Sequence, residues 1–192
     1  MTSIRPFRAD DVFKFNTTNL DPLTETYGLD FYYSYLARWP SLFLVAEGSN
    51  GEILGYIMGK VEESPAYLKN HEHYLPWHAH ITALTVAPQA RRLGLARLLS
   101  QCLETAGEKE DAWFVDLFVR KSNKIAIALY EGLGYTVFRV VKDYYSDNAT
   151  PGSRPGQGED AYDMRKPLKR DVKREHVRDN GKEFEVQPED VW

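Results

Sequence analysis

The sequence predicts one α/β domain built on a mixed, largely antiparallel sheet, and three observations lead to this fold class. The chain has 192 residues, of which 43% are hydrophobic and 27% charged, which suits one globular domain with a buried core. Apolar runs that meet around Asn50-Gly51 indicate a β-hairpin. Strand and helix patterns alternate between residues 80 and 142, which predicts a parallel crossover within the sheet.

The individual elements follow from local signals along the chain. Asp10 can cap a first helix that runs to about Asn19. A second helix is expected from Asp30 to Trp39, because the residue before Pro40 is disfavoured in helical geometry. The other expected elements are strands at 3–7, 42–46, 53–61, 80–86, 113–119, 135–142 and 161–164, helices at about 92–108 and 123–132, and loops at 63–77 and 147–160.

Charge and cysteine content exclude several classes of protein. With 24 basic and 28 acidic side chains the formal net charge is -4, so no global positive field would hold nucleic acid or an anionic membrane. The single cysteine, Cys102, excludes an internal disulfide, and its helical spacing predicts a core position. The first residues resemble no signal peptide and no apolar run is long enough for a membrane span. We therefore expect a cytoplasmic protein that binds neither nucleic acid nor membrane directly.

A candidate anion site lies where the strand at 80–86 gives way to the next helix. The segment Arg91-Arg92-Leu93-Gly94-Leu95-Ala96 occupies this junction. The first N–H groups of a helix lack intrahelical partners, and together with the helix dipole they bind anions. Gly94 and Ala96 allow close backbone approach, while Arg91 and Arg92 add forked donors for phosphate. Taken alone, the segment is better interpreted as an ordinary helix start with exposed arginines.

A second segment, Asn123-Lys124-Ile125-Ala126-Ile127-Ala128-Leu129-Tyr130, follows the next strand. Together the two segments resemble the GNAT superfamily of acetyl-CoA-dependent acetyltransferases, whose patterns are R/Q-x-x-G-x-G/A and N-x-x-A-x-x-L-Y. The resemblance implies a GNAT fold with flanking helices and a central pair of parallel strands splayed around acetyl-CoA. The cofactor-binding residues that it implies are Leu84, Thr85, Val86, Arg91, Arg92, Leu93, Gly94, Leu95, Ala96, Asn123 and Tyr130.

Acetyl transfer from a thioester needs a neutral amine, a donor for the oxyanion and a proton for the leaving thiolate. We expect Tyr130, His80 and Asn123 to be the catalytic residues. Tyr130 is the candidate general acid, although a tyrosine before a Gly-x-Gly turn could merely pack. His80 could accept a proton, directly or through water, or donate a hydrogen bond to the substrate. Histidines 71, 73, 78 and 80 match no established zinc spacing, so no metal is expected.

Over residues 1 to about 167 the chain resembles one subfamily of these acetyltransferases in particular. The segments 20–28, 55–60, 116–120 and 160–166 look like those of catalytic subunits of NatB N-terminal acetyltransferases. This implies acetylation of nascent proteins that start Met-Asp, Met-Glu, Met-Asn or Met-Gln, by direct attack in a ternary complex. It also implies a large helical-repeat auxiliary subunit that connects the enzyme to the ribosome. The implied substrate-binding residues are Glu25, Tyr27, Gly28, His80, Thr82, Phe118, Tyr144 and Tyr145.

Elementary chemistry makes this specificity reasonable. Asp and Asn share a carbonyl-type acceptor, so neutral donors such as Thr82 can bind both, whereas an arginine would favour the acids. An α-amino group, with a reference pKa of about 8, is easier to neutralise than a lysine at about 10.4. A methionine thioether packs favourably against a ring such as Phe118. Two alternatives remain: a GNAT enzyme acting on lysine or a small amine, and a binding module that keeps the fold without catalysis.

Two further expectations concern the ends of the chain. Residues 1–167 are expected to form the GNAT domain, and residues 168–192, with alternating charge blocks, a tail that is disordered or binds a partner. The first two predicted helices carry more aromatic surface than a two-layer core needs, so some of it is expected to contact the auxiliary subunit. These aromatic residues are Phe13, Phe15, Phe31, Tyr32, Tyr33, Tyr35 and Trp39.

Overall fold

The structure is a computed structural model that describes residues 2–20, 24–71, 74–145 and 158–191. The chain divides into two compact units. The first unit comprises residues 1–61 and 81–110, and the second comprises residues 62–80 and 111–192. The predicted domain boundary after residue 167 stays a prediction, and most of the predicted loop at 147–160 lies outside the described residues. Among the described helices, none is both long and apolar enough to span a bilayer.

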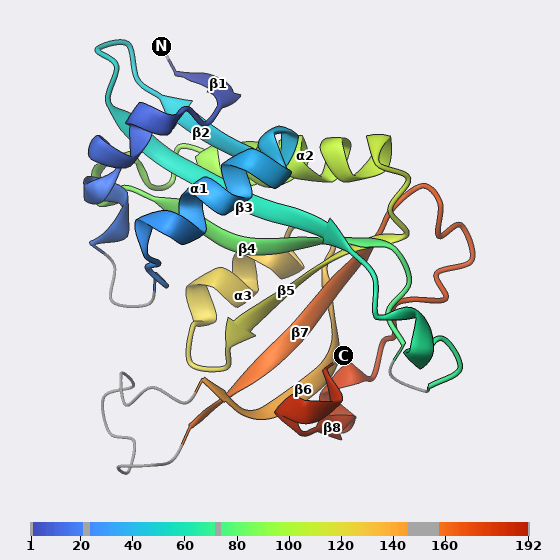
Figure 1. Cartoon of the computed structure of the whole chain (residues 1–192). Helices are drawn as coiled ribbons and strands as arrows, with labels where there is room; N and C mark the ends of the chain where they lie inside the picture. Colours follow the sequence, from blue (N-terminus) through green and yellow to red (C-terminus); the bar gives the residue numbers. More distant parts are fainter. Residues whose placement is uncertain (1, 21–23, 72–73, 146–157, 192) are drawn as a thin grey trace. The chain divides into compact units, whose positions relative to one another are not determined.

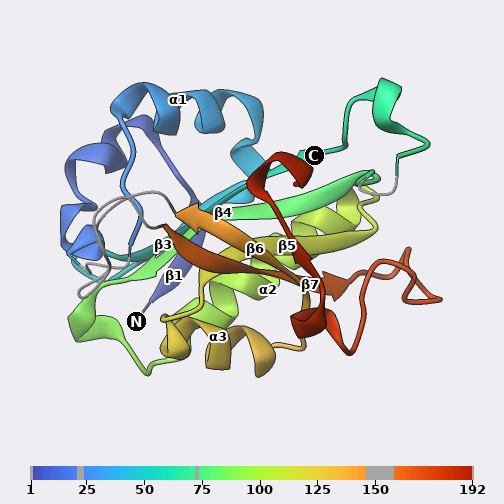
Figure 2. The same cartoon turned by 90° about the horizontal axis from the view of Figure 1, so that it is seen from below.

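The first unit is built on strands that follow one another in chain order. β1 (Ser3–Pro6), β2 (Phe43–Glu47) and β3 (Ile53–Glu62) pair antiparallel, and β3 neighbours β4 (His78–Val86). The predicted hairpin between β2 and β3 is confirmed, and Gly51 takes the left-handed φ of 80° there. Helices α1 (Leu29–Arg38) and α2 (Leu95–Lys109) lie on opposite faces of these strands (Figures 1 and 2).

Residues 9–19 differ from the single helix that the sequence predicts. They form two 3₁₀ segments instead, η1 (Ala9–Phe13) and η2 (Asn16–Asn19). The buried carboxylate of Asp11 accepts hydrogen bonds from the Arg5 guanidinium at 2.7 and 2.9 Å and from the Arg8 amide at 2.8 Å, which fixes a tight turn. Thr18 bonds through its hydroxyl to the Phe15 carbonyl, a local bond that competes with α-helix. Tertiary and local side-chain bonds therefore override the helical pattern.

An aromatic core explains how η1, η2 and α1 attach to the first unit. Phe7 stacks on Phe43 with ring centroids 3.9 Å apart, and Phe15 packs edge-on against Tyr32 at 5.0 Å. The hydroxyl of the buried Tyr56 donates to the Asn19 side chain at 3.0 Å. Segments separated by many residues are thus joined by ring contacts that local sequence patterns do not reveal.

The buried face of helix α2 includes polar residues, Ser100 and Glu104, beside its leucines. Leu95, Leu99 and Leu103, spaced by four residues, are buried. Leu98 is 44% exposed, and Cys102 is half-buried, so its predicted core position is wrong. Both residues lie at the border of the buried face, on the side away from Ser100 and Glu104. Two short 3₁₀ segments of this unit, η3 (Pro40–Leu42) and η5 (Pro88–Ala90), precede β2 and α2.

The second unit holds strands in the order β5, β7, β6 and β8. β7 lies between β5 and β6 and pairs antiparallel with both (Figure 1). β8 runs parallel to β6, which confirms a mixed, largely antiparallel arrangement. The element bounds are β5 (Phe114–Arg120), α3 (Lys124–Glu131), β6 (Thr136–Tyr145), β7 (Glu159–Pro167), β8 (Glu185–Val186), η4 (Ala66–Leu68), η6 (Gly181–Glu183) and η7 (Pro188–Asp190).

A buried charge cluster joins β6, β7 and the end of the chain. The Asp163 carboxylate, fully buried, accepts hydrogen bonds from Arg139 at 2.8 Å and from Arg165 at 2.9 and 3.0 Å. The same Arg139 guanidinium donates to the main-chain carbonyls of Asp190 and Val191 at 3.2 and 3.3 Å. The tail is thereby attached to β6 through its backbone, and the Val191 side chain is buried.

Candidate active site

The predicted anion segment of the first unit lies at the N-terminus of α2. β4 ends at Val86, and the chain then passes through η5 to Gly94. Gly94 has a left-handed φ of 81° and directly precedes Leu95, the first residue of α2. Arg92 also has a positive φ, 62°, an uncommon conformation for a residue with a side chain. The Arg91 side chain donates to the Val86 carbonyl at 3.2 Å. Because the first turn of α2 has no acidic side chain, its N-terminus keeps the positive end of the helix dipole.

The end of β4 packs tightly against its neighbours in the first unit. Thr85 is buried, and its hydroxyl donates to the Thr18 carbonyl at 2.6 Å. A Cβ on Gly55 would lie 2.8 Å from the Thr85 carbonyl oxygen, so only glycine fits there on β3. Leu84 and Val86 flank Thr85 and are half-buried. The end of β4, which the resemblance implies to bind the cofactor, is therefore closely packed on both η2 and β3.

Two substrate residues predicted in the first unit, Tyr27 and Thr82, are in contact. The Tyr27 hydroxyl donates to the Thr82 carbonyl at 3.3 Å, and Tyr27 stacks on Phe31 at 4.4 Å. Gly28 precedes the first residue of α1, and Glu25 is half-buried. Sequence reasoning missed Tyr35, whose hydroxyl lies 2.9 Å from the Thr82 hydroxyl. Its signal was its place in the tyrosine-rich second helix, which was interpreted as a partner surface.

In the second unit His80 is held by a residue that sequence reasoning did not single out. Nδ1 of His80 lies 2.8 Å from Oδ1 of Asp116, a carboxylate that is buried on β5. A charged residue in the middle of the apolar run Phe114–Val119 was the signal that could have identified it, because buried carboxylates are rare unless paired. The His80 side chain itself is 14% exposed.

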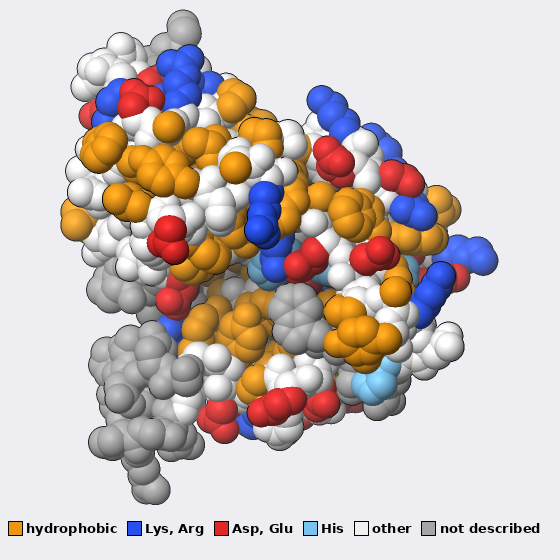
Figure 3. All heavy atoms as spheres, in the orientation of Figure 1, with side chains coloured by type: hydrophobic (Ala, Val, Ile, Leu, Met, Phe, Trp, Pro, Cys, Tyr) orange, Lys and Arg blue, Asp and Glu red, His pale blue; other side chains and the backbone are white. Residues whose placement is uncertain are grey.

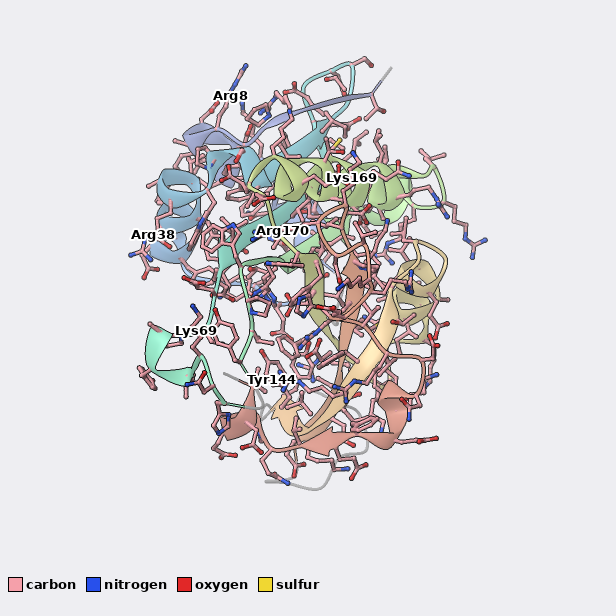
Figure 4. The ribbon with its side chains drawn as sticks, turned by 90° about the vertical axis from the view of Figure 1, so that its right-hand side faces the viewer. Arg8, Arg38, Lys69, Tyr144, Lys169 and Arg170 are labelled. Atoms are coloured by element: carbon pink, nitrogen blue, oxygen red, sulfur yellow. The ribbon has the colours of Figure 1, made fainter. Side chains whose placement is uncertain are left out.

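The predicted aromatic residues of the second unit form one cluster. Phe118 stacks on Tyr144 with centroids 4.6 Å apart and contacts the His80 ring at 5.7 Å. The Tyr145 hydroxyl donates to the Phe118 carbonyl at 3.2 Å, and the Arg120 guanidinium lies 4.0 Å from the Tyr145 ring. Tyr144, labelled in Figure 4, is 37% exposed near the end of β6. The structure thus brings His80, Phe118, Tyr144 and Tyr145 together.

Asn123 and Tyr130 lie at opposite ends of α3. Oδ1 of Asn123 accepts from the Ala126 amide at 3.1 Å and caps the helix, a use that leaves the amide nitrogen of the side chain as a donor. Tyr130 is buried and packs edge-on against Tyr135 at 5.5 Å. Burial raises the pKa of Tyr130 above its ordinary value of 10.0, so the phenol keeps its proton at neutral pH.

Histidines 71, 73, 78 and 80 lie close together in the sequence, although no metal site is expected from their spacing. His73 lies outside the described residues, and His71, His78 and His80 fall in the second unit. Within residues 2–20, 24–71, 74–145 and 158–191, no three His, Cys, Asp or Glu side chains are grouped so as to hold a metal ion.

Comparison with known proteins settles the family. Residues 10–135 match the acetyltransferase (GNAT) family. The chain belongs to the GNAT family. This acetyltransferase is 52% identical over 193 residues to the N-terminal acetyltransferase B complex catalytic subunit naa20 of Schizosaccharomyces pombe, with 100% of the chain and 99% of the relative covered. It is 49% identical to N-alpha-acetyltransferase 20 of Dictyostelium discoideum, with 92% of each covered.

Solved structures agree with these relatives. The GNAT chain superposes with a TM-score of 0.95 and 60% identity on Naa20 of Chaetomium thermophilum in complex with a bisubstrate analogue, with 99% of each chain covered. It superposes with a TM-score of 0.79 and 41% identity on a chain of a NatB acetyltransferase complex bound to a bisubstrate inhibitor, again with 99% of each covered. The predicted fold class and the resemblance to NatB catalytic subunits are therefore confirmed.

The left-handed glycine before α2 leads to a first prediction for this GNAT enzyme. Replacing Gly94 by Ala keeps open space around the new methyl group but forces a side chain into a left-handed conformation, which costs about 1–2 kcal/mol. Because the strained residue lies in the segment that the sequence predicts to bind the cofactor, we expect weaker binding of acetyl-CoA, measured by calorimetry, together with lower stability.

Gly51→Ala is the matched control for Gly94→Ala. Gly51 has a φ of 80° and open space too, but it lies in the β2–β3 hairpin. The control should lose similar stability in urea unfolding and keep the Kd of acetyl-CoA. An equal loss of cofactor affinity in both variants would show that the effect of Gly94 is merely global.

Proposed function

We propose that this GNAT enzyme is the catalytic subunit of a NatB-type N-terminal acetyltransferase. It transfers the acetyl group of acetyl-CoA to the α-amino group of nascent proteins that start Met-Asp, Met-Glu, Met-Asn or Met-Gln. The observation that carries the proposal is full-length similarity to catalytic subunits of that complex, at 52% identity to the fission yeast protein and a TM-score of 0.95 to a Naa20 structure. Acetyl-CoA as the donor is supported by a related NatB complex that was solved with CoA bound.

In this proposal the α2 N-terminus of the first unit holds the pyrophosphate of the cofactor. The amides of Gly94, Leu95 and Ala96 would donate to phosphate oxygens, and Arg91 and Arg92 would add charge. The geometry fits the group, because the left-handed Gly94 turns the chain into a helix start without an acidic side chain. The backbone of Leu84–Val86 would bind the pantetheine arm, as would Asn123 in the second unit.

The proposed substrate contacts use neutral groups. In the first unit, Thr82 is bonded to the hydroxyls of Tyr27 and Tyr35, and these hydroxyls can act as donors or acceptors. Such groups bind the side chains of Asp and Asn alike. In the second unit, the stacked rings of Phe118 and Tyr144 offer an apolar surface suited to a methionine thioether. Glu25, Gly28 and Tyr145 are proposed to complete the peptide contacts.

We assign the proton transfers to residues of the second unit. When bound, acetyl-CoA supplies the thioester whose acetyl group is transferred. His80, directly or through a water molecule, takes a proton from the substrate ammonium, and the neutral amine forms a bond to the acetyl carbon. The carbon–sulfur bond breaks with its electron pair on sulfur, and Tyr130 donates the proton that makes the thiol. The second proton of the amine restores Tyr130, so that the net reaction releases one proton.

An apolar surface supports the proposed auxiliary subunit. Of the aromatic residues predicted for this role, Phe15, Tyr32 and Tyr35 are buried, whereas Phe13 is 77% and Tyr33 37% exposed. Figure 3 shows hydrophobic side chains gathered over α1 and the segment before it. We propose that this face of the first unit docks the helical-repeat subunit, which would bring the enzyme to the ribosome in the cytoplasm.

A comparison of peptide substrates tests the proposed function. The full-length chain, alone and with an auxiliary subunit, is assayed for release of CoA thiol with peptides that differ only in their first two residues. We expect Met-Asp and Met-Asn peptides to react with similar kcat/KM, because neutral donors recognise both side chains. An N-terminally blocked peptide with an internal lysine should not react. Acetylation of that lysine without acetylation of Met-Asp would support a lysine acetyltransferase and overturn the proposal.

A further inference from the structure

Alternating side chains of β4 and β5 form a row in the second unit. His78 stacks on Phe114 with centroids 4.9 Å apart and an interplanar angle of 7°. Two residues further along each strand, His80 meets Asp116, and its ring also contacts Phe118 at 5.7 Å. Side chains two apart on a strand share a face, which explains the alignment. The row therefore places one buried carboxylate among rings, with His80 as its hydrogen-bond donor.

The ionisation of Asp116 decides where the proton of this contact lies. Burial raises the pKa of Asp116, but electrostatic interactions with His78, His80 and Arg165 and the hydrogen bond from His80 outweigh it and hold the pKa well below its usual range. The carboxylate is thus ionised at neutral pH and can only accept. Nδ1 of His80 must therefore carry the proton of the 2.8 Å bond. In a neutral imidazole this leaves the lone pair on Nε2.

His78 shows what a purely structural histidine looks like in the same row. It is 1% exposed, and its Nδ1 donates to the Pro76 carbonyl at 2.7 Å. Burial lowers the pKa of His78, so the ring is neutral at pH 7, and its Nε2, 3.7 Å from Oδ2 of Asp116, has no proton to donate. Both nitrogens of His78 therefore face the interior, unlike the partly exposed His80.

The other charged groups near this row do not replace His80 as the partner of Asp116. Arg165 lies opposite Asp116 in the β5–β7 register, but its guanidinium donates to Asp163 through two nitrogens. Glu62 lies 4.0 Å from Nε2 of His78, on the far side of that ring from the Pro76 contact. The Asp116 carboxylate is consequently directed at one donor, the imidazole of His80.

We propose that Asp116 is a positioning residue for acetyl transfer: it fixes His80 in the Nδ1–H tautomer and so presents Nε2 as the proton acceptor for the substrate amine. This inference rests on the proposed function for the role of His80, and it names the residue that sets the tautomer which this role requires. An imidazole freed from Asp116 could rotate or take the other tautomer, in which Nε2 carries a proton and cannot accept one. The protons balance, because the proton that Nε2 takes from the substrate is the one that the net reaction releases.

Asp116→Asn tests the inference, because the amide can donate to Nδ1 and so favour the wrong tautomer. We expect kcat for a Met-Asp peptide to fall about 10- to 100-fold, with the KM for acetyl-CoA unchanged. In a His80→Ala background the same substitution should have little further effect, since Asp116 acts through His80. An equal fall of kcat in both backgrounds would overturn the proposal.

A nitrogen-15 NMR measurement of His80 needs no variant and separates this inference from the proposed function. In the unmodified chain, at a pH where the ring is neutral, Nδ1 should give a protonated and Nε2 an unprotonated resonance. The reverse pattern would overturn the role of Asp116 even if Met-Asp peptides are acetylated. If the tautomer is as expected but no peptide N-terminus reacts, the proposed function fails and the claim that Nε2 serves an amine fails with it.

Asp171→Asn is the matched control for loss of a buried carboxylate. Asp171 is 3% exposed in the same unit and accepts from the amides of Glu175 and His176 at 2.8 and 3.1 Å. This variant should lose stability but keep kcat. A fall of kcat as large as that of Asp116→Asn would show that any buried carboxylate change in this unit has the same effect, contrary to the proposal.

Discussion

Tyr130→Phe should lower kcat about 100-fold or more while leaving acetyl-CoA binding intact, because the substitution removes a proton donor and keeps the buried ring. Burial raises the pKa of Tyr130, so its phenol stays protonated to beyond pH 10. Ionisation of this group should therefore cause no loss of kcat between pH 7 and pH 10. Steady-state rates across that range, with calorimetric titration of acetyl-CoA, measure both expectations.

Tyr162→Phe is the control for the removed hydroxyl. Tyr162 is a half-buried residue of β7 whose ring lies 5.8 Å from the ammonium groups of Lys121 and Lys182. Its ring contacts survive the change, so kcat should stay near that of the unmodified enzyme. If Tyr130→Phe also keeps its full kcat with normal cofactor affinity, Tyr130 only packs and another group protonates the thiolate.

Asp163→Ala is expected to cause the largest loss of stability, about 3–5 kcal/mol in the free energy of unfolding. The substitution leaves the buried guanidinium groups of Arg139 and Arg165 without their shared carboxylate. Domains of this size are stable by roughly 5–15 kcal/mol, so the variant would be close to unfolding. Urea unfolding followed by circular dichroism measures the change.

Asp160→Ala is the comparison on the same strand. Asp160 also binds two cations, Lys121 at 3.1 Å and Lys142 at 2.8 Å, but both lysines are about one-third exposed. Exposed ion pairs contribute at most about 1 kcal/mol, so this variant should remain folded. Equal destabilisation by the two substitutions would contradict the view that burial, and not the number of ion pairs, sets the cost.

The sequence predicts features whose signals lie within a few consecutive residues. The Asn50-Gly51 turn needs only its own backbone conformation, and Gly94 marks the start of α2 by the same means. The helix predicted for residues 9–19 is wrong because Arg5, which lies outside the segment, holds Asp11 in a tight turn. A pattern within one segment does not reveal a hydrogen-bond partner that lies outside that segment.

The candidate site also contains some residues that local sequence patterns predict and others that only the structure reveals. The family resemblance predicted roles for Asn123, Tyr130 and the segment 91–96, but it did not point to the carboxylate that holds His80. Asp116 is separated from His80 by 36 positions, and their contact depends on the register of two strands. Similarly, the charged composition of the tail does not reveal that Arg139 holds it through main-chain carbonyls. Side-chain partners over long sequence separations require the structure.

The attachment of the tail has a consequence for solubility. β8 pairs with β6 along Val140 and Val141, and in the described part of the chain it covers the side of β6 that faces away from β7. An uncovered strand of this kind offers unpaired amides and carbonyls to any other extended chain. Truncation before Glu185 would expose the edge of β6 at Val140 and Val141, and we expect it to favour aggregation.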